Sequence, residues 1–176
     1  EKLYEQNIIE IKEDGYILGF GYMWAHLPNQ VHWIGQPDFP CFKRNKKDDR
    51  AVVKELFKLI NEADYYIAHN GKNFDNKVAN TSFLLHGLGP PDNPVAHDTK
   101  QLFKSTFRLP SNKLDEIGRI LKLGRKVPHT GKKLWFDCME GDPKAWKTME
   151  EYCKQDVMLL KEIWDIVKPW MKNPPN

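Results

Sequence analysis

Long apolar runs are missing from this chain of 176 residues. No stretch approaches the ~18 consecutive apolar residues of a membrane span, and none has the pattern of a signal peptide. Cysteine is scarce as well. Cys41, Cys138 and Cys153 are odd in number and widely spaced, which excludes a disulfide framework and a paired metal-ligand motif. These absences predict an intracellular protein in a reducing cytoplasm, with no membrane partner.

The chain does contain enough apolar sequence for one folded domain. Hydrophobic residues make up 40% and aromatic residues 12% of the sequence, which excludes a disordered segment. A chain of this length can bury a sizeable core without disulfide bonds or a structural metal ion. We predict one domain over residues 1–170 and a linker or tail over residues 171–176, which contain Asn-Pro-Pro-Asn.

The hydrophobic pattern predicts strands that alternate with helices. The aromatic, glycine-rich run 15–24 and residues 31–34 flank a Pro-Asn turn and predict a hairpin, and short strands are expected at 65–68 and 95–97. Helices are expected after Asp48 or Asp49, over 73–86, after Asp98 and from Ser111, and a long amphipathic helix is expected from Pro143 to just before Pro169. This alternation predicts an α/β or α+β domain.

Two short segments contain candidate functional residues. The turn His69-Asn70-Gly71 follows a predicted buried strand, and Asp75 lies in the first turn of the next helix. Ligands collect at such strand ends in α/β sheets, although Asp75 can equally serve only to complement the helix dipole. Tyr152 and Asp156 lie four residues apart on one face of the long helix, where a Tyr–Asp hydrogen bond at the edge of the core is the structural alternative.

Taken together, these segments resemble a known enzyme family. Asn-x-x-x-Phe-Asp after a short strand, followed by Tyr-x-x-x-Asp on a late helix, resembles the second and third motifs of the DEDDy 3′–5′ exonucleases of the ribonuclease H-like superfamily. The step from Asn70 to Asp75 is similar to that in family-B polymerase proofreading domains. Predicted exonucleases of bacteriophages have segments similar to residues 97–99, 109–114 and 139–146.

The resemblance implies a fold, a reaction and a set of residue roles. The fold would be a ribonuclease H-like mixed β-sheet flanked by α-helices. In this chain the sheet can lack its first strand. The reaction would be hydrolysis of DNA from its 3′ end, single-stranded for preference, with two Mg²⁺ or Mn²⁺ ions. Asp75 and Asp156 would be metal ligands, Tyr152 would position the attacking water, and Asn70 and Phe74 would contact the terminal nucleotide. The phage resemblance implies a bacterial cytoplasm.

One family motif is missing from the sequence. The first motif is a strand bearing Asp-x-Glu, which supplies a bridging Asp and a Glu to the two ions, and residues 1–14 contain no such triplet. Two ions that share ligands need about four acidic groups, so its absence predicts weak metal binding and little turnover. We expect the chain to begin just downstream of this motif. Glu10 is the alternative source of a carboxylate.

A basic stretch independently indicates a polyanionic partner. Residues 100–133 contain ten Lys and Arg residues against Asp115 and Glu116, a net charge of +8, whereas the whole chain has +3. Arg125, Lys126, Lys132 and Lys133, close to aromatic residues at 135 and 136, suit a groove that follows a DNA backbone, or an RNA backbone. A solvated helix face explains such a stretch equally well.

Two rivals to the exonuclease therefore stay open. A catalytically inactive nucleic-acid-binding module would keep the fold and the basic groove without the first motif. A purely structural α/β domain would have no salt-dependent affinity for DNA.

Overall fold

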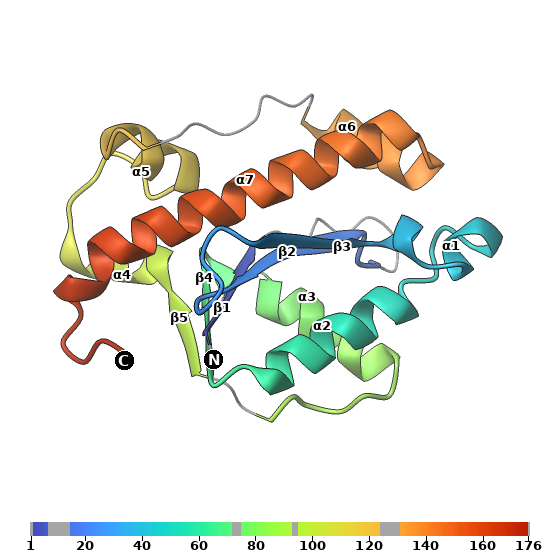
Figure 1. The fold of residues 1–176 in the computed structure, drawn as a ribbon, viewed down its shortest axis with the longest axis horizontal. Coiled ribbons are helices and arrows are strands. Elements are labelled where there is room, and N and C mark those ends of the chain that lie inside the picture. Colours follow the sequence, from blue (N-terminus) through green and yellow to red (C-terminus); the bar gives the residue numbers. More distant parts are fainter. Residues whose placement is uncertain (1, 7–14, 72–74, 93–94, 124–130, 176) are drawn as a thin grey trace.

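The computed structural model describes residues 2–6, 15–71, 75–92, 95–123 and 131–175, and it has a sheet with helices on both faces (Figure 1). Five strands form one mixed sheet in the order β3-β2-β1-β4-β5. β1 is antiparallel to β2, and β2 is antiparallel to β3, whereas β4 is parallel to both β1 and β5. The strands are β1 (Lys2–Gln6), β2 (Gly19–Trp24), β3 (Val31–Gly35), β4 (Tyr65–Ala68) and β5 (Val95–Asp98).

The central strand of this sheet comes from the first residues of the chain. In β1, Leu3 is paired with Trp24 of β2 on one side and with Tyr66 of β4 on the other. The sequence analysis did not predict this strand and allowed for a sheet without its first strand. In the described residues the central position is filled by Lys2–Gln6, and the fold class of a mixed sheet flanked by helices is confirmed.

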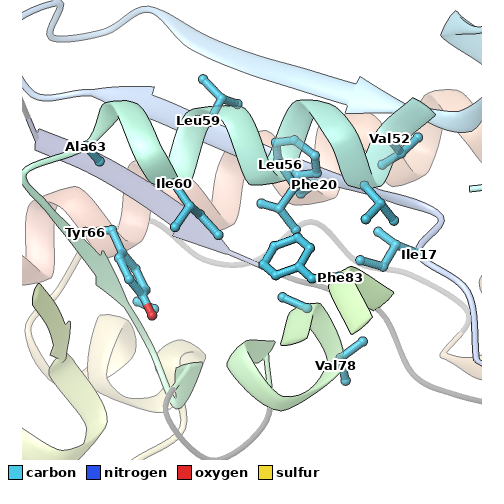
Figure 2. Close-up of a cluster of buried hydrophobic side chains, with 13 residues drawn as sticks. Ile17, Phe20, Val52, Leu56, Leu59, Ile60, Ala63, Tyr66, Val78 and Phe83 are labelled. Atoms are coloured by element: carbon cyan, nitrogen blue, oxygen red, sulfur yellow. The ribbon is translucent and has the colours of Figure 1, made fainter. Parts of the chain in front are cut away.

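Alternating side chains of the strands face two helical layers. Phe20, Tyr66 and Ala68 pack with α2 (Arg50–Glu62) and α3 (Asp75–Leu85), in the hydrophobic cluster that Figure 2 shows. Met23 and Ile67 lie in a second cluster on the opposite face of the sheet. This separation follows from the two-residue period of a strand.

The second face of the sheet is covered by α7 (Pro143–Val167), which packs against β1, β2 and β3. Its apolar residues recur at steps of three and four, so that one stripe of the helix is buried. Figure 1 shows α7 running across this face, opposite α2 and α3. Three further helices pack on α7: α4 (Thr99–Thr106), α5 (Leu114–Ile120) and α6 (Lys132–Glu140).

The remaining short elements join these layers. The 3₁₀ turn η1 (Gln36–Asp38) and the one-turn helix α1 (Cys41–Arg44) follow β3, and the 3₁₀ turn η3 (Lys168–Trp170) follows α7. No helix among the described residues is long and apolar enough to span a membrane.

Several predicted boundaries are confirmed and others are wrong. The hairpin, the N-cap at Asp98 and the long final helix are as expected. Ser111 does not begin a helix: its hydroxyl accepts a hydrogen bond from the Lys113 amide, and α5 begins at Leu114. The loop expected after β3 contains α1, and the helix α6 was not predicted.

Candidate active site

The turn after β4 has a strained backbone that is fixed by α4. Asn70 has a φ of 68°, a left-handed conformation that is uncommon outside glycine and recurs at functional sites. Its amide donates a hydrogen bond of 3.0 Å to Oδ1 of Asp98. The same carboxylate accepts from the amides of Lys100 and Gln101 and so caps α4. One side chain therefore holds both the turn and the start of α4.

His69 fixes the same turn from its other side. Its Nδ1 lies 2.8 Å from the Thr99 hydroxyl, and its Nε2 lies 2.9 Å from the carbonyl oxygen of Asn112. Because a carbonyl only accepts, Nε2 must have the proton. The ring thus ties the end of β4 to α4 and to the segment before α5. The sequence analysis named His69 only as part of the candidate turn and did not predict its partners, which lie 30 and 43 residues away.

Asp75 is the first residue of α3, and only 8% of it is exposed. A Cβ built on Gly71 would lie 4.0 Å from Asp75 Oδ2 and 2.6 Å from the Ala68 Cβ. The carboxylate therefore lies beside Gly71 at the end of β4, where a larger side chain would collide with Ala68. Phe74, which was predicted to contact a nucleotide, lies outside the described residues.

Tyr152 and Asp156 lie on the part of α7 that crosses the sheet. Tyr152 is 6% exposed and belongs to a hydrophobic cluster with Leu18, while Asp156 is completely buried. A Cβ on Gly21 of β2 would lie 3.2 Å from both the Cys153 carbonyl oxygen and Val157 Cγ2. The absence of a side chain at Gly21 lets the helix approach the strand at this level.

The strand register brings these positions to one end of the sheet. In the parallel pair, Tyr4 is opposite Ile67, so Gln6 at the end of β1 is level with the residue that follows β4. Gln6 is also opposite Gly21, the residue over which α7 crosses. The carboxyl ends of β1 and β4 therefore meet below the Asp156 segment and beside the start of α3. This is the edge at which α/β sheets bind ligands.

The two aspartates are suitable ligands for a hard cation but form an incomplete two-ion site. A buried carboxylate requires a partner, and carboxylate oxygens are the ligands that Mg²⁺ and Mn²⁺ prefer. Among the described residues, no group of three or more His, Cys, Asp or Glu residues is arranged to hold a metal. Two ions that share ligands need about four acidic groups, so the described side chains do not fit that site. Glu10 lies outside the described residues.

The predicted basic groove is described only in part. Lys132 and Lys133 are exposed at the start of α6, which packs against α7, and Lys133 forms a 2.6 Å ion pair with Asp137. Arg125 and Lys126 lie outside the described residues. The structure thus puts two of the four basic residues on a helix that contacts α7, the helix of Tyr152 and Asp156.

One further histidine in this region has a structural environment. His97 of β5 packs against the rings of Tyr65 and Trp164, and burial lowers its pKa. Its ring is therefore neutral at neutral pH and packs at the edge of the core beside Trp164.

A comparison with family models identifies the superfamily. The model described as the RNase H superfamily matches residues 14–168. The chain belongs to the RNase H superfamily. This membership agrees with the mixed sheet and with the α7 crossing described above. No curated protein matches the sequence.

Solved structures that are similar to this chain include a DNA polymerase and an EXO domain. The family B DNA polymerase of Pyrobaculum calidifontis is similar with a TM-score of 0.74 and 13% identity, over 96% of this chain and 24% of the polymerase. The Aedes aegypti Nibbler EXO domain is similar with a TM-score of 0.63 and 13% identity, over 96% of this chain and 78% of that domain. The chain thus spans about a quarter of the polymerase's length. At this identity the likeness concerns the fold.

Proposed function

We propose that this RNase H superfamily chain is a 3′–5′ exonuclease domain that hydrolyses DNA, single-stranded for preference, with Mg²⁺ or Mn²⁺. The observation that supports this proposal best is the pair of aspartates. Asp75 and Asp156 come from two different helices, are more than nine-tenths buried, and lie at the same end of the sheet. Buried carboxylates at a sheet end are costly unless they bind a cation or a polar partner.

Each site residue has a proposed role in this reaction. Asp75 and Asp156 would hold the metal, which when bound would supply positive charge beside the phosphodiester. Tyr152 would orient the attacking water, and Asn70 and Phe74 would contact the terminal nucleotide. Arg125, Lys126, Lys132 and Lys133 follow the DNA backbone. The additional acidic groups that two ions need would come from side chains outside the described set. We also propose, from the resemblance of residues 97–99, 109–114 and 139–146 alone, an origin in a phage or prophage and a role in the bacterial cytoplasm.

The test is a cleavage assay with matched variants. A 5′-labelled single-stranded oligonucleotide is incubated with the protein and Mn²⁺, beside an EDTA control. We expect a ladder that shortens from the 3′ end and is lost in EDTA. Asp156→Asn should abolish it, and Tyr152→Phe should reduce it by roughly 10²–10⁴-fold, the usual contribution of a group that positions a reacting proton. Glu151→Gln, on the exposed side of α7, is the control that should retain full activity.

A second function is supported by a separate observation. The described residues contain no group of three or more metal-ligating side chains, and the sequence contains no Asp-x-Glu in residues 1–14. Both facts favour a nucleic-acid-binding module of the same fold without catalysis. In that case the oligonucleotide stays intact in Mn²⁺ but is retained by the protein. A ladder that Asp156→Asn leaves unchanged would instead contradict the proposed site itself.

A further inference from the structure

An exposed tryptophan lies at the C-terminal end of α7, beyond the candidate active site. Trp170 is 63% exposed and contacts Phe107 with ring centroids 5.1 Å apart in a T-shaped arrangement. Phe107 in turn contacts the buried Phe103 at 5.3 Å. The indole is therefore held against the core by its contact with Phe107, while most of its surface faces solvent.

The two segments that meet at this ring contact are strongly basic. Residues 99–113 and 166–175 contain six Lys or Arg residues and no Asp or Glu, although the whole chain has a net charge of only +3. We call the Trp170 surface the set of Phe107, Trp170, Lys104, Arg108, Lys168 and Lys172. Within the part of the chain that the structure describes, none of its four basic residues forms an ion pair.

We propose that the Trp170 surface binds single-stranded nucleic acid as a second contact region, distinct from the candidate active site. Aromatic rings stack on unpaired bases, and Lys and Arg neutralise the phosphates on either side. A duplex hides its base faces, so an exposed indole favours a single strand. This inference rests on the nucleic-acid substrate of the proposed function and adds where a longer strand is held.

The geometry gives the surface a length requirement. Val167, the last residue before η3, is eleven residue steps along α7 from Asp156, which corresponds to about 16 Å of helix. A stacked strand advances ~3.4 Å per nucleotide, so this distance spans about five nucleotides. An oligonucleotide whose 3′ end lies at Asp156 therefore reaches Trp170 only when it is longer than about five nucleotides.

The experiment measures binding without cleavage. Fluorescence anisotropy in EDTA gives the Kd of 5′-fluorescein dT₁₆ and dT₄ for the intact chain, Trp170→Ala, Trp170→Phe and Leu85→Ala. We expect Trp170→Ala to weaken dT₁₆ binding on the order of tenfold, because stacking contributes ~1–3 kcal/mol per base. Trp170→Phe should stay within about twofold, and dT₄ should not respond. Leu85 is a matched control because it is equally exposed but lies on α3.

A charge variant tests the same surface through its salt dependence. Replacing Arg108 and Lys168 together with Gln should flatten the slope of log K against log[salt] by about 1.4, since each phosphate contact on a single strand contributes ~0.7. Equal binding of dT₁₆ by the intact chain and Trp170→Ala would overturn the inference, as would no binding by the intact chain. A concentration-dependent dimer that Trp170→Ala abolishes, without DNA binding, would assign the surface to a second copy. If the intact chain binds dT₁₆ but does not cleave an oligonucleotide in Mn²⁺, only the proposed hydrolysis is contradicted, and the inference about the Trp170 surface stands.

Discussion

The turn after β4 is held by a hydrogen bond between the side chains of His69 and Thr99. The Thr99 hydroxyl is completely buried and has one proton, yet it faces both Nδ1 of His69 at 2.8 Å and the Ala68 carbonyl at 3.2 Å. The hydroxyl can donate to the Ala68 carbonyl and accept from a protonated Nδ1, or it can donate to an unprotonated Nδ1; in both cases it is hydrogen-bonded to His69. His69 and Thr99 are therefore hydrogen-bonded partners, and removing either side chain takes away one partner of the other.

This coupling is measurable by a double-mutant cycle. His69→Ala and Thr99→Val should each lower the free energy of unfolding by roughly 1–3 kcal/mol, because each leaves a buried polar partner. The double variant should lose less than the sum, with an interaction energy of about 0.5–3 kcal/mol. Urea unfolding of the four proteins provides the values. Additivity to within about 0.5 kcal/mol would mean that the two side chains act separately.

The three cysteines should differ sharply in reactivity. Cys138 and Cys153 are fully buried, and burial raises the pKa of Cys138 to about 12, so almost none of it is thiolate at pH 8. Cys41 is half-buried in α1. Titration with a chromogenic disulfide reagent at pH 8 should therefore detect rapid reaction of Cys41 alone in the folded protein, and of all three thiols in urea. Cys41→Ser should remove the rapid reaction.

The acidic residues of the candidate site could be predicted from the sequence, whereas the hydrogen bonds that hold the neighbouring turn could not. Asp75 and Asp156 are visible because a recognisable spacing surrounds each of them. The two bonds of His69 and the bond from Asn70 to Asp98 join residues that are close only after folding, at separations of 28 to 43 residues. A local pattern cannot contain such pairs. The roles of Asp75, Tyr152 and Asp156 in catalysis stay predictions.

Among the elements, α7 depends on close contact with β2. A Cβ at Gly21 would lie 3.2 Å from the Cys153 carbonyl, tighter than ordinary contact, and backbone cannot move aside as a flexible side chain can. Gly21→Val should therefore displace the Cys153–Val157 segment and lower the free energy of unfolding by about 1–3 kcal/mol. It should also reduce any activity that depends on Asp156.

The matched control for Gly21→Val is His32→Val, which places the same β-branched side chain at an exposed position of β3 and removes a ring contact with Tyr22. Thermal unfolding of both variants separates the effect of helix contact from that of strand propensity. If Gly21→Val unfolds at the same temperature as His32→Val, the close approach of α7 does not constrain this position.

The elements that the sequence analysis missed lack strong local signals. In α6 the buried residues are Leu134 and Cys138 alone, and its N-cap Gly131 provides no side-chain hydrogen bond. Ser111 has the right residue type for a cap, but its hydroxyl bonds to Lys113 while α5 begins three residues later. β1 is a strand because β2 and β4 flank it, which is a tertiary cause that no local window contains.

At the scale of the whole molecule, one buried carboxylate joins three separate segments. Asp49 accepts a 2.7 Å hydrogen bond from the amide of Ile17, which precedes β2, and its other oxygen lies 2.7 Å from Nε2 of His86, which follows α3. Its own backbone begins α2. The sequence predicted a cap at this position, but the side chain makes no capping bond and instead ties the layer of α2 and α3 to the sheet.

Asp49→Ala should therefore lower the stability of the whole domain, although Asp49 lies outside the candidate site. It leaves the Ile17 amide without its acceptor and removes the hydrogen-bond partner of the His86 ring, and leaving a buried polar group unsatisfied commonly costs ~1–3 kcal/mol. Asp49→Asn keeps one carbonyl acceptor for Ile17 and should lose about half as much. Asp38→Asn is the control, because Asp38 is exposed and accepts from Gly35 within one turn. Urea unfolding followed by tryptophan fluorescence gives the three values. Asp49 joins the layers if Asp49→Ala shifts the midpoint most, Asp49→Asn shifts it about half as far and Asp38→Asn shifts it little. Equal small shifts for all three variants would mean that hydrophobic packing between sheet and helices suffices.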